Sequence, residues 1–417
     1  MLACGEGEEK PVNTLKKEKN IALALGGFCL VLALFLCYKW WKIFLAVCTG
    51  VIYSDVPLHI ELALGHNDYG LSSLLIQLFY LGGEHFAQRA LALCLTGNNL
   101  IGLFTVALLV RFLLPRLSRL EAFLAAELAA LCGPWLIPGY QMGIYLQAHN
   151  GNLYHNMTVL FSRTLIPVSL LCFFRCWAAR HGCIPRKDWW GFAISFFIVT
   201  AFKPNFAFAF LPVLAVLLLW DLIKYRGKYL KNEFLLGCAV LPSGFLCIWQ
   251  YLVLFNNSFG QSAEEMLQEL DENFVDTSSG MALRLLWGTE LVGVLVMYLR
   301  SLLLPVYTLA LQGWREKERR NLGLFLAVEL TALVEATVLV ETGYRANHGN
   351  FDWGGLALYP TVFALAIGLL LRMMQDINWK KPLDIFKCLL GLGILLGHLM
   401  VGLYFLWFFN SGGSYFI

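Results

Sequence analysis

The chain has 417 residues, of which 59% are hydrophobic and 14% are charged, and its mean hydropathy is +0.65. This composition is too apolar for a soluble protein of this length, the formal net charge is +3, and no nucleic-acid partner is expected. We therefore expect an all-α, polytopic membrane protein with no soluble domain.

The predicted elements begin with a charged tail at 1–20, which lacks the apolar core of a signal peptide. The apolar run after it is therefore expected to be retained as a helix, and 21–417 to form one transmembrane domain. A helix needs about 20 apolar residues to cross about 30 Å of hydrocarbon. About eleven spans are predicted, near 21–38, 90–113, 120–139, 157–176, 189–202, 205–222, 233–255, 285–311, 322–340, 355–372 and 386–409.

Basic residues concentrate in six polar breaks. These breaks hold 23 of the 31 Lys and Arg residues and lie at 1–20, 111–120, 175–188, 223–232, 313–320 and 372–387. Basic loops stay in the cytoplasm, so we expect an integral membrane protein with its N-terminus inside and its C-terminus outside. The segment 189–222 joins two such breaks and is interrupted by Lys203-Pro204-Asn205. Proline disfavours helical geometry in the residue before it, so a tight hairpin with this tripeptide at its outer apex is predicted.

Polar residues gather in the outer loops, predicted at 50–70, 140–156, 256–281 and 341–354. The centres of the spans carry few charges, with Arg300, Glu329 and Glu335 as exceptions. A transporter is expected to place ionisable residues near mid-membrane on discontinuous helices, so the pattern favours an enzyme at the outer interface. A flippase, a transporter or a polymerase of lipid-linked saccharides is the alternative. The segment 256–281 is interpreted as a solvated loop helix or as an amphipathic lid.

Four outer motifs carry a family resemblance: Asp55 in "YSDVPLH" after the first span, "NLYHNMTVLFSR", "KPNF" and "YRANHGNFDWG". With this layout the chain resembles the GT-C superfamily of integral-membrane glycosyltransferases, and in particular bacterial GT-C-like proteins of unassigned substrate. The resemblance implies transfer of a sugar from a polyprenyl-phosphate donor to a glycan, lipid or polymer acceptor on the outer face, usually with inversion. Such chemistry needs a base, cations for the leaving phosphate and polar groups that orient the sugar.

Asp55 is the predicted general base. It is expected to lie at the outer edge of the membrane, where its carboxylate could accept the proton of an acceptor hydroxyl. On a helix, His59 would share a face with Asp55 and orient the carboxylate or the acceptor. Asp55 beside Val56-Pro57 also fits a helix N-cap, and the two roles are compatible. Asp68 in "HNDYG" is the reserve base, although this motif is also typical of a turn.

Arg345, Lys203 and Arg163 are the predicted phosphate ligands. Arginine offers a planar fork of donors and lysine a compact charge. An alternative for Arg345 is an intrahelical pair with Glu341, and Lys203 could instead snorkel to the headgroups. Arg163 lies about two turns inside a span, where an isolated cation is costly, so we expect it to face a cavity.

Mixed hydrogen-bonding groups suited to sugar and acceptor hydroxyls complete the predicted substrate-binding set. They are Asn150, Asn152, His155, Asn156, Asn205, Glu341, His348, Asn350 and Asp352. No spacing indicates a metal site, and no cofactor is expected. We further expect Asp55, His155, Lys203 and Arg345 to converge on one outward-facing cavity.

Overall fold

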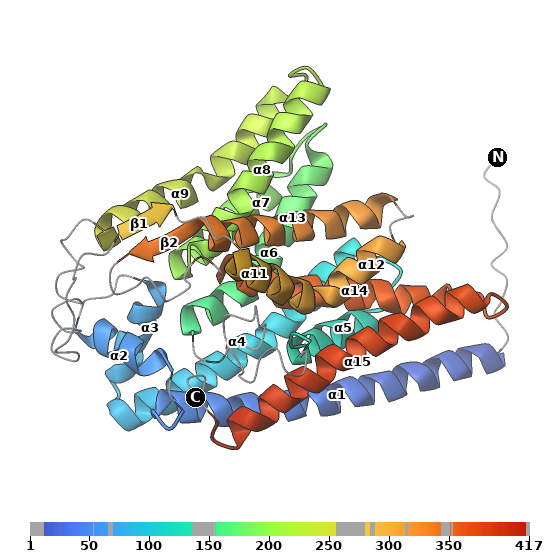
Figure 1. Cartoon of the computed structure of the whole chain (residues 1–417), viewed down its shortest axis with the longest axis horizontal. Coiled ribbons are helices and arrows are strands. Elements are labelled where there is room, and N and C mark those ends of the chain that lie inside the picture. The colour runs from blue at the N-terminus through green and yellow to red at the C-terminus, as the bar shows by residue number, and fades with distance from the viewer. Residues whose placement is uncertain are drawn as a thin grey trace.

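The structure is a computed structural model that describes residues 12–52, 54–65, 70–135, 154, 156–255, 280–283, 288–312, 316–342, 351 and 353–413. The described chain is almost wholly helical (Figure 1). In chain order its elements are α1 (Val12–Cys48), α2 (Val56–Leu64), α3 (Leu71–Tyr80), α4 (Glu84–Leu113), α5 (Arg119–Leu131), α6 (Met157–Ala179), α7 (Arg186–Phe202), α8 (Asn205–Lys224), α9 (Leu230–Phe255), β1 (Gly280–Leu283), α11 (Gly288–Ser301), α12 (Leu303–Gln312), α13 (Glu316–Val338), β2 (Leu339–Thr342), α14 (Trp353–Gln375) and α15 (Pro382–Asn410).

The helices confirm a polytopic α-helical membrane protein. Eight of the described helices are long and apolar enough to cross a bilayer, or up to nine if the bent pair α11 and α12 forms one span. That pair bends by 66° at a short break. Helices α5 and α7 have 13 and 17 residues and fall below the length of a full span. The predicted number of eleven is therefore not established, although each predicted span overlaps a helix or the bent pair.

One pair of strands departs from the expected all-α architecture. Strands β1 and β2 pair antiparallel, with Gly280 opposite Thr342 and Leu283 opposite Leu339. Strand β2 follows α13 directly, so the chain leaves this helix as an extended segment.

Helix α14 occupies the centre of the bundle. In the most apolar stretch of this helix, 89% of the residues are buried. Helix α14 contacts seven other helices, namely α4, α5, α6, α8, α12, α13 and α15. The corresponding stretch of α1 is only 11% buried, so most of its apolar side chains face outward, as expected for a helix in contact with lipid. Functional groups near α14 are therefore held by packed helices on several sides.

The predicted helical span at 120–139 is interrupted after Leu131. Helix α5 ends at Leu131, and Cys132–Trp135 continue without helical structure across α15. Pro134 disfavours helical geometry in Gly133, and the freed backbone groups find distant partners. The Gly133 N–H donates to the His398 carbonyl at 3.0 Å, and the His398 Nδ1 lies 2.6 Å from the Gly133 carbonyl oxygen.

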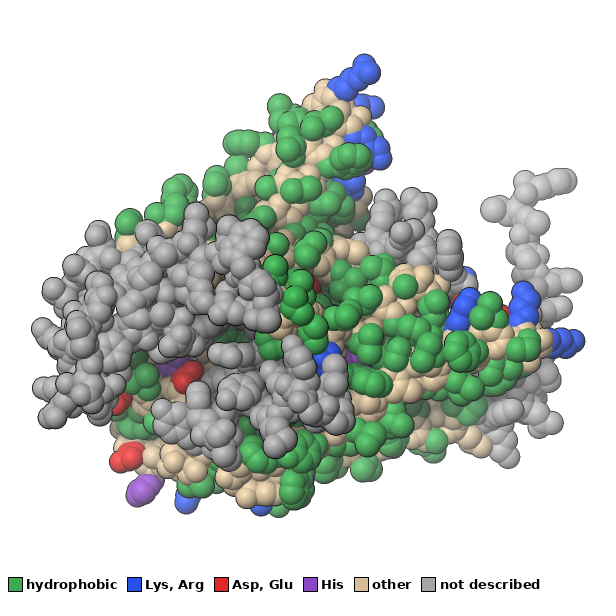
Figure 2. Space-filling model, viewed as in Figure 1, with side chains coloured by type: hydrophobic (Ala, Val, Ile, Leu, Met, Phe, Trp, Pro, Cys, Tyr) green, Lys and Arg blue, Asp and Glu red, His purple; other side chains and the backbone are tan. Residues whose placement is uncertain are grey.

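Charged groups are distributed unevenly over the visible surface (Figure 2). Lys and Arg gather at the protruding end of α7, α8 and α9 and near the turn between α14 and α15, whereas hydrophobic side chains cover much of the described surface between. This distribution matches a bundle whose basic turns lie outside the hydrocarbon.

Candidate functional site

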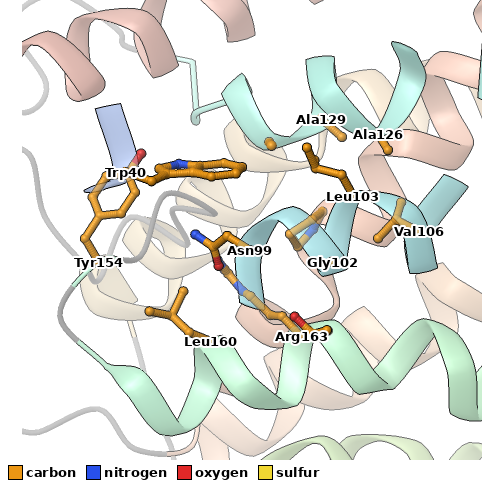
Figure 3. A pocket seen from close by; sticks show the side chains of 13 residues that line it. Trp40, Asn99, Gly102, Leu103, Val106, Ala126, Ala129, Tyr154, Leu160 and Arg163 are labelled. Carbon is orange, nitrogen blue, oxygen red and sulfur yellow. The ribbon is translucent and has the colours of Figure 1, made fainter. Parts of the chain in front are cut away.

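The candidate site is a cavity between α1, α4, α5 and α6, bordered by α14 (Figure 3). The volume open to the centre of a water molecule is about 60 Å³, enough for a few waters. Its polar lining consists of Asn99, Tyr154, Arg163 and Thr164, with Trp40 beside them. Small and aliphatic side chains line the remainder, namely Gly102, Leu103, Val106, Ala126, Ala129, Ala130, Leu160 and Pro360. The cavity thus combines one cation and several hydrogen-bonding groups with an apolar wall.

Arg163 faces this cavity, as the sequence predicts, and also binds the backbone of α14. Its Nε and Nη2 atoms donate to the Leu356 carbonyl at 3.1 and 2.6 Å. Pro360 stands four residues after Leu356 and has no N–H, so the helix itself cannot supply the donor for this carbonyl. The guanidinium supplies it instead, and this contact fixes its position between α6 and α14.

Lys203 lies at the turn between α7 and α8 and faces the start of α14. Helix α7 ends at Phe202 and α8 begins at Asn205, which confirms the predicted helical hairpin. The Lys203 Nζ lies 5.2 Å from the centre of the Trp353 ring. A Cβ placed on Gly354 would be 2.8 Å from the Asn205 carbonyl oxygen, so this glycine allows the first turns of α8 and α14 to touch. Lys203 and Asn205 therefore meet α14 within three residues of the carbonyl that holds Arg163.

Tyr154 closes the cavity beside the first turn of α6. Its ring packs edge-on against Phe44 and Phe409, with centroids 6.1 and 5.6 Å away. Burial raises the pKa of the Tyr154 hydroxyl, whereas a hydrogen bond with Trp40 and the positive charge of Arg163 act in the opposite direction. The hydroxyl therefore stays protonated at neutral pH and keeps a proton that it can donate.

Asn156 serves as the N-cap of α6. Its side-chain oxygen accepts hydrogen bonds from the Val159 N–H at 3.2 Å and the Thr158 hydroxyl at 2.7 Å, and its side chain is buried. The geometry assigns this predicted sugar ligand a structural task at the start of the helix that carries Arg163.

Asp55 and His59 lie on α2, which contacts α1 and α3. Asp55 occupies the N-cap position with Pro57 in the first turn, but its side chain makes no hydrogen bond to the first-turn amides. The His59 N–H donates to the Asp55 carbonyl at 2.9 Å, so the two residues stand one turn apart, and both side chains are half-buried. Helix α3 contacts both α2, which follows Asp55, and α7, which ends at Phe202 next to Lys203.

Several predicted residues lie outside the described part of the chain: Asp68, Asn150, Asn152, His155, Arg345, His348, Asn350 and Asp352. The predicted segment 256–281 is outside it as well, apart from its last two residues, which belong to β1. Glu341 lies in β2 opposite Met281. The alternative of a pair with Arg345 within one helix is therefore wrong, because Glu341 is in a strand. Among the described residues, no group of three or more His, Cys, Asp or Glu side chains is placed to hold a metal ion.

Five components of the site were missed from the sequence: Trp40, Asn99, Tyr154, Thr164 and the Leu356 carbonyl. Two signals were present. Asn99 is a polar side chain inside an apolar run, and Pro360 inside a predicted span marks a freed carbonyl four residues earlier. The partner of that carbonyl is 193 residues away in sequence, and no local pattern identifies it.

Comparisons with protein-family models, curated proteins and solved structures find no match to this chain.

Proposed function

We propose that this protein is a membrane glycosyltransferase of the GT-C type. It takes a sugar from a polyprenyl-phosphate carrier and transfers it, with inversion, to a glycan, lipid or polymer on the extracytoplasmic face of a bacterial plasma membrane. In this proposal the N-terminus is cytoplasmic, the C-terminus is outside, and no cofactor is used.

The observation that supports this proposal is that two cations from different elements each contact the first turns of α14. Arg163 comes from α6 and Lys203 from the α7–α8 turn, and both contact α14 within its first four residues. A phosphate leaving group requires positive charge held in place before the reaction, because the charge that develops is then stabilised without reorganisation. The adjacent cavity adds the polar groups of Asn99, Tyr154 and Thr164 beside Arg163.

Asp55 is the base in this proposal. It would accept the proton of the acceptor hydroxyl while Lys203 and Arg163 stabilise the departing phosphate. His59, one helical turn away, would orient the carboxylate or the acceptor. Asn205 and Tyr154 supply hydrogen-bonding groups near the two cations.

A flippase or transporter of lipid-linked saccharides is the second candidate, and the bundle interior favours it in one respect. Glu127, Arg300, Glu329 and His398 are at most 6% exposed inside the bundle. Ionisable groups in such positions are typical of pathways through a membrane. A polymerase of lipid-linked saccharides would share the cation site of the first proposal.

Binding of undecaprenyl phosphate to the purified full chain tests the shared part of these proposals. Lys203→Met keeps most of the side-chain volume and removes the charge, and we expect the affinity to fall roughly 10-fold or more. Lys42→Met is the matched control, because Lys42 is an exposed cation 5.8 Å from the Tyr38 ring and should not affect binding. Equal affinity of the parent and the Lys203→Met variant would reject the site.

Mass spectrometry of lipid-linked and surface glycans, with and without the gene, separates the two functions. Loss of one sugar from a surface glycan, with its polyprenyl-linked donor accumulating, supports the transferase. An intact glycan made of the same sugars but retained on the cytoplasmic side supports the flippase and rejects the transferase.

A further inference from the structure

The turns between α6 and α7 and between α8 and α9 form one rigid unit, here called the tip (residues 175–188 and 221–234). Asp221, 3% exposed at the end of α8, accepts hydrogen bonds from Arg180 and lies 3.0 Å from the His181 Nε2. The Asn232 amide at the start of α9 donates to the carbonyls of Arg180 and Gly182 at 2.7 and 2.8 Å. Residues from the two turns are therefore presented on one surface.

Aromatic contacts strengthen this connection. The His181 ring lies 4.4 Å from the centres of both the Tyr225 and the Tyr229 rings. The Arg180 guanidinium stacks 3.9 Å from the centre of the Trp177 ring. The two turns cannot separate without breaking these contacts together with the buried ion pair.

All three carboxylates of the tip are turned inward. Asp188, Asp221 and Glu233 are 7%, 3% and 5% exposed, and Asp188 pairs with Arg175 at 3.5 Å. The exposed charges that remain are cations: Arg186, Lys187, Lys224, Arg226, Lys228 and Lys231. Within this fully described segment none of the six forms an ion pair. The tip is thus a concentrated positive surface, visible as the blue cluster at the top of Figure 2.

The turns between α4 and α5 and between α14 and α15 provide a contrast. Exposed charges of both signs occur there: Arg116 pairs with Asp376 at 3.7 Å, and both side chains are about half exposed. The Gln375 amide also donates to Glu121 at 2.6 Å. Positive charge in these turns is therefore partly balanced at the surface, whereas in the tip it is not.

Large apolar side chains border the cations of the tip. Trp190, Trp220, Leu230 and Phe234 are between 56% and 68% exposed on α7, α8 and α9. Trp side chains prefer the interface between hydrocarbon and headgroups, which places the neighbouring cations at headgroup level. A positive surface at that level complements anionic lipid, and each Lys or Arg near the surface contributes measurably to such binding.

We propose that the tip is a binding surface for anionic phospholipid headgroups on the side of the membrane where the α6–α7 and α8–α9 turns emerge. The six cations contact the phosphates, and the exposed aromatic side chains lie in the adjoining hydrocarbon edge. This inference does not depend on the sugar-transfer proposal, because none of its residues belongs to the cavity.

Native mass spectrometry tests the surface with the full chain in micelles that contain equal amounts of phosphatidylglycerol and phosphatidylcholine. The parent should retain phosphatidylglycerol preferentially. A tip variant with Lys187, Lys224, Lys228 and Lys231 each changed to Gln should lose roughly 10-fold or more of this preference. A control variant with Arg116, Arg119, Lys380 and Lys381 changed to Gln removes the same charge and should stay within about 2-fold of the parent.

A local measurement places the lipid at the tip. Cys183 is the exposed cysteine among the described ones and lies in the α6–α7 turn. A sulfonated maleimide should label Cys183 more slowly in nanodiscs with phosphatidylglycerol than in phosphatidylcholine nanodiscs, and the tip variant should remove the difference. Equal lipid preference in the parent and the tip variant overturns the proposal. Equal losses of this lipid preference in the tip and control variants also overturn it. So does a tip variant that keeps the preference for phosphatidylglycerol but no longer binds an acidic protein that the parent binds.

Discussion

Removal of the Arg163 guanidinium should lower the free energy of unfolding, and the size of this effect should depend on Pro360 in α14. Arg163→Met keeps an unbranched side chain in α6 and leaves the Leu356 carbonyl without its two donors at 3.1 and 2.6 Å. Pro360→Ala restores an N–H four residues after Leu356, where a regular helix would donate to that carbonyl. The two substitutions should therefore be strongly non-additive.

The expected magnitude follows from the burial of this carbonyl. Leu356 is 2% exposed, and an unsatisfied buried acceptor costs about 1–3 kcal/mol. In the Pro360→Ala background the helix satisfies the carbonyl, so only the loss of the charge-assisted contact remains. We expect Arg163→Met to cost about 1–2 kcal/mol less in that background than in the parent.

The assay is a double-mutant cycle on the free energy of unfolding, measured by titration with SDS in mixed micelles. Pro212→Ala is the control, because Pro212 is an exposed proline inside α8 and its freed carbonyl, at Phe208, is not the one that Arg163 contacts. Arg163→Met and Pro212→Ala should be additive within about 0.5 kcal/mol. If the coupling energy between Arg163→Met and Pro360→Ala is no larger than that between Arg163→Met and Pro212→Ala, the Leu356 carbonyl does not link Arg163 to Pro360.

Three further substitutions test other contacts. Gly402→Ala should prevent folding, because its Cβ would overlap the Leu131 carbonyl oxygen at the end of α5. Gly393→Ala on the same helix meets nothing within 4 Å and should be neutral or stabilising, and equal yields of folded protein for the two variants would contradict this. Asp221→Asn should lower the free energy of unfolding by about 3–5 kcal/mol, because it breaks a buried ion pair. Asp376→Asn, in an exposed ion pair, should lower it by under about 1 kcal/mol. Similar losses in the two variants would show that burial does not decide how much each ion pair contributes to stability. Asp55→Asn should reduce sugar transfer from a polyprenyl-phosphate donor roughly 100-fold with unchanged thermal unfolding, and transfer at the parent rate would exclude it as the base.

Much of the fold is predictable from the sequence because burial in a bilayer imposes long apolar runs. The hairpin at Lys203-Pro204-Asn205 is an example. Pro204 cannot donate to the preceding turn, and α7 indeed ends at Phe202 while α8 starts at Asn205. The placement of Arg163 towards a cavity follows from the same reasoning, since an isolated cation on a lipid-facing surface would be costly.

Features set by distant partners were not predictable in this way. The apolar run after Leu131 reads as more helix, yet Gly133 and Trp135 make backbone hydrogen bonds to His398 and Arg300, which come from α15 and α11. The spacing of Glu341 and Arg345 allows a pair within a helix, yet Glu341 pairs in a strand with Met281. In each case the competing structure satisfies backbone groups through a segment far away in sequence, and local periodicity carries no information about such a partner.

The two cations at the start of α14 are therefore unequal as probes of function. Arg163 donates to a carbonyl that Pro360 has left without a helical partner, so its removal perturbs the packing of α6 on α14 before it perturbs any ligand. Lys203 approaches Trp353 at 5.2 Å, and a cation–π contact of this kind contributes about 0.5–2 kcal/mol. A loss of phosphate binding in Lys203→Met can thus be assigned to charge more directly than the same loss in Arg163→Met. If Arg163 contributes to donor binding as well, that contribution is measurable only in the Pro360→Ala background, where the helix holds the carbonyl by itself.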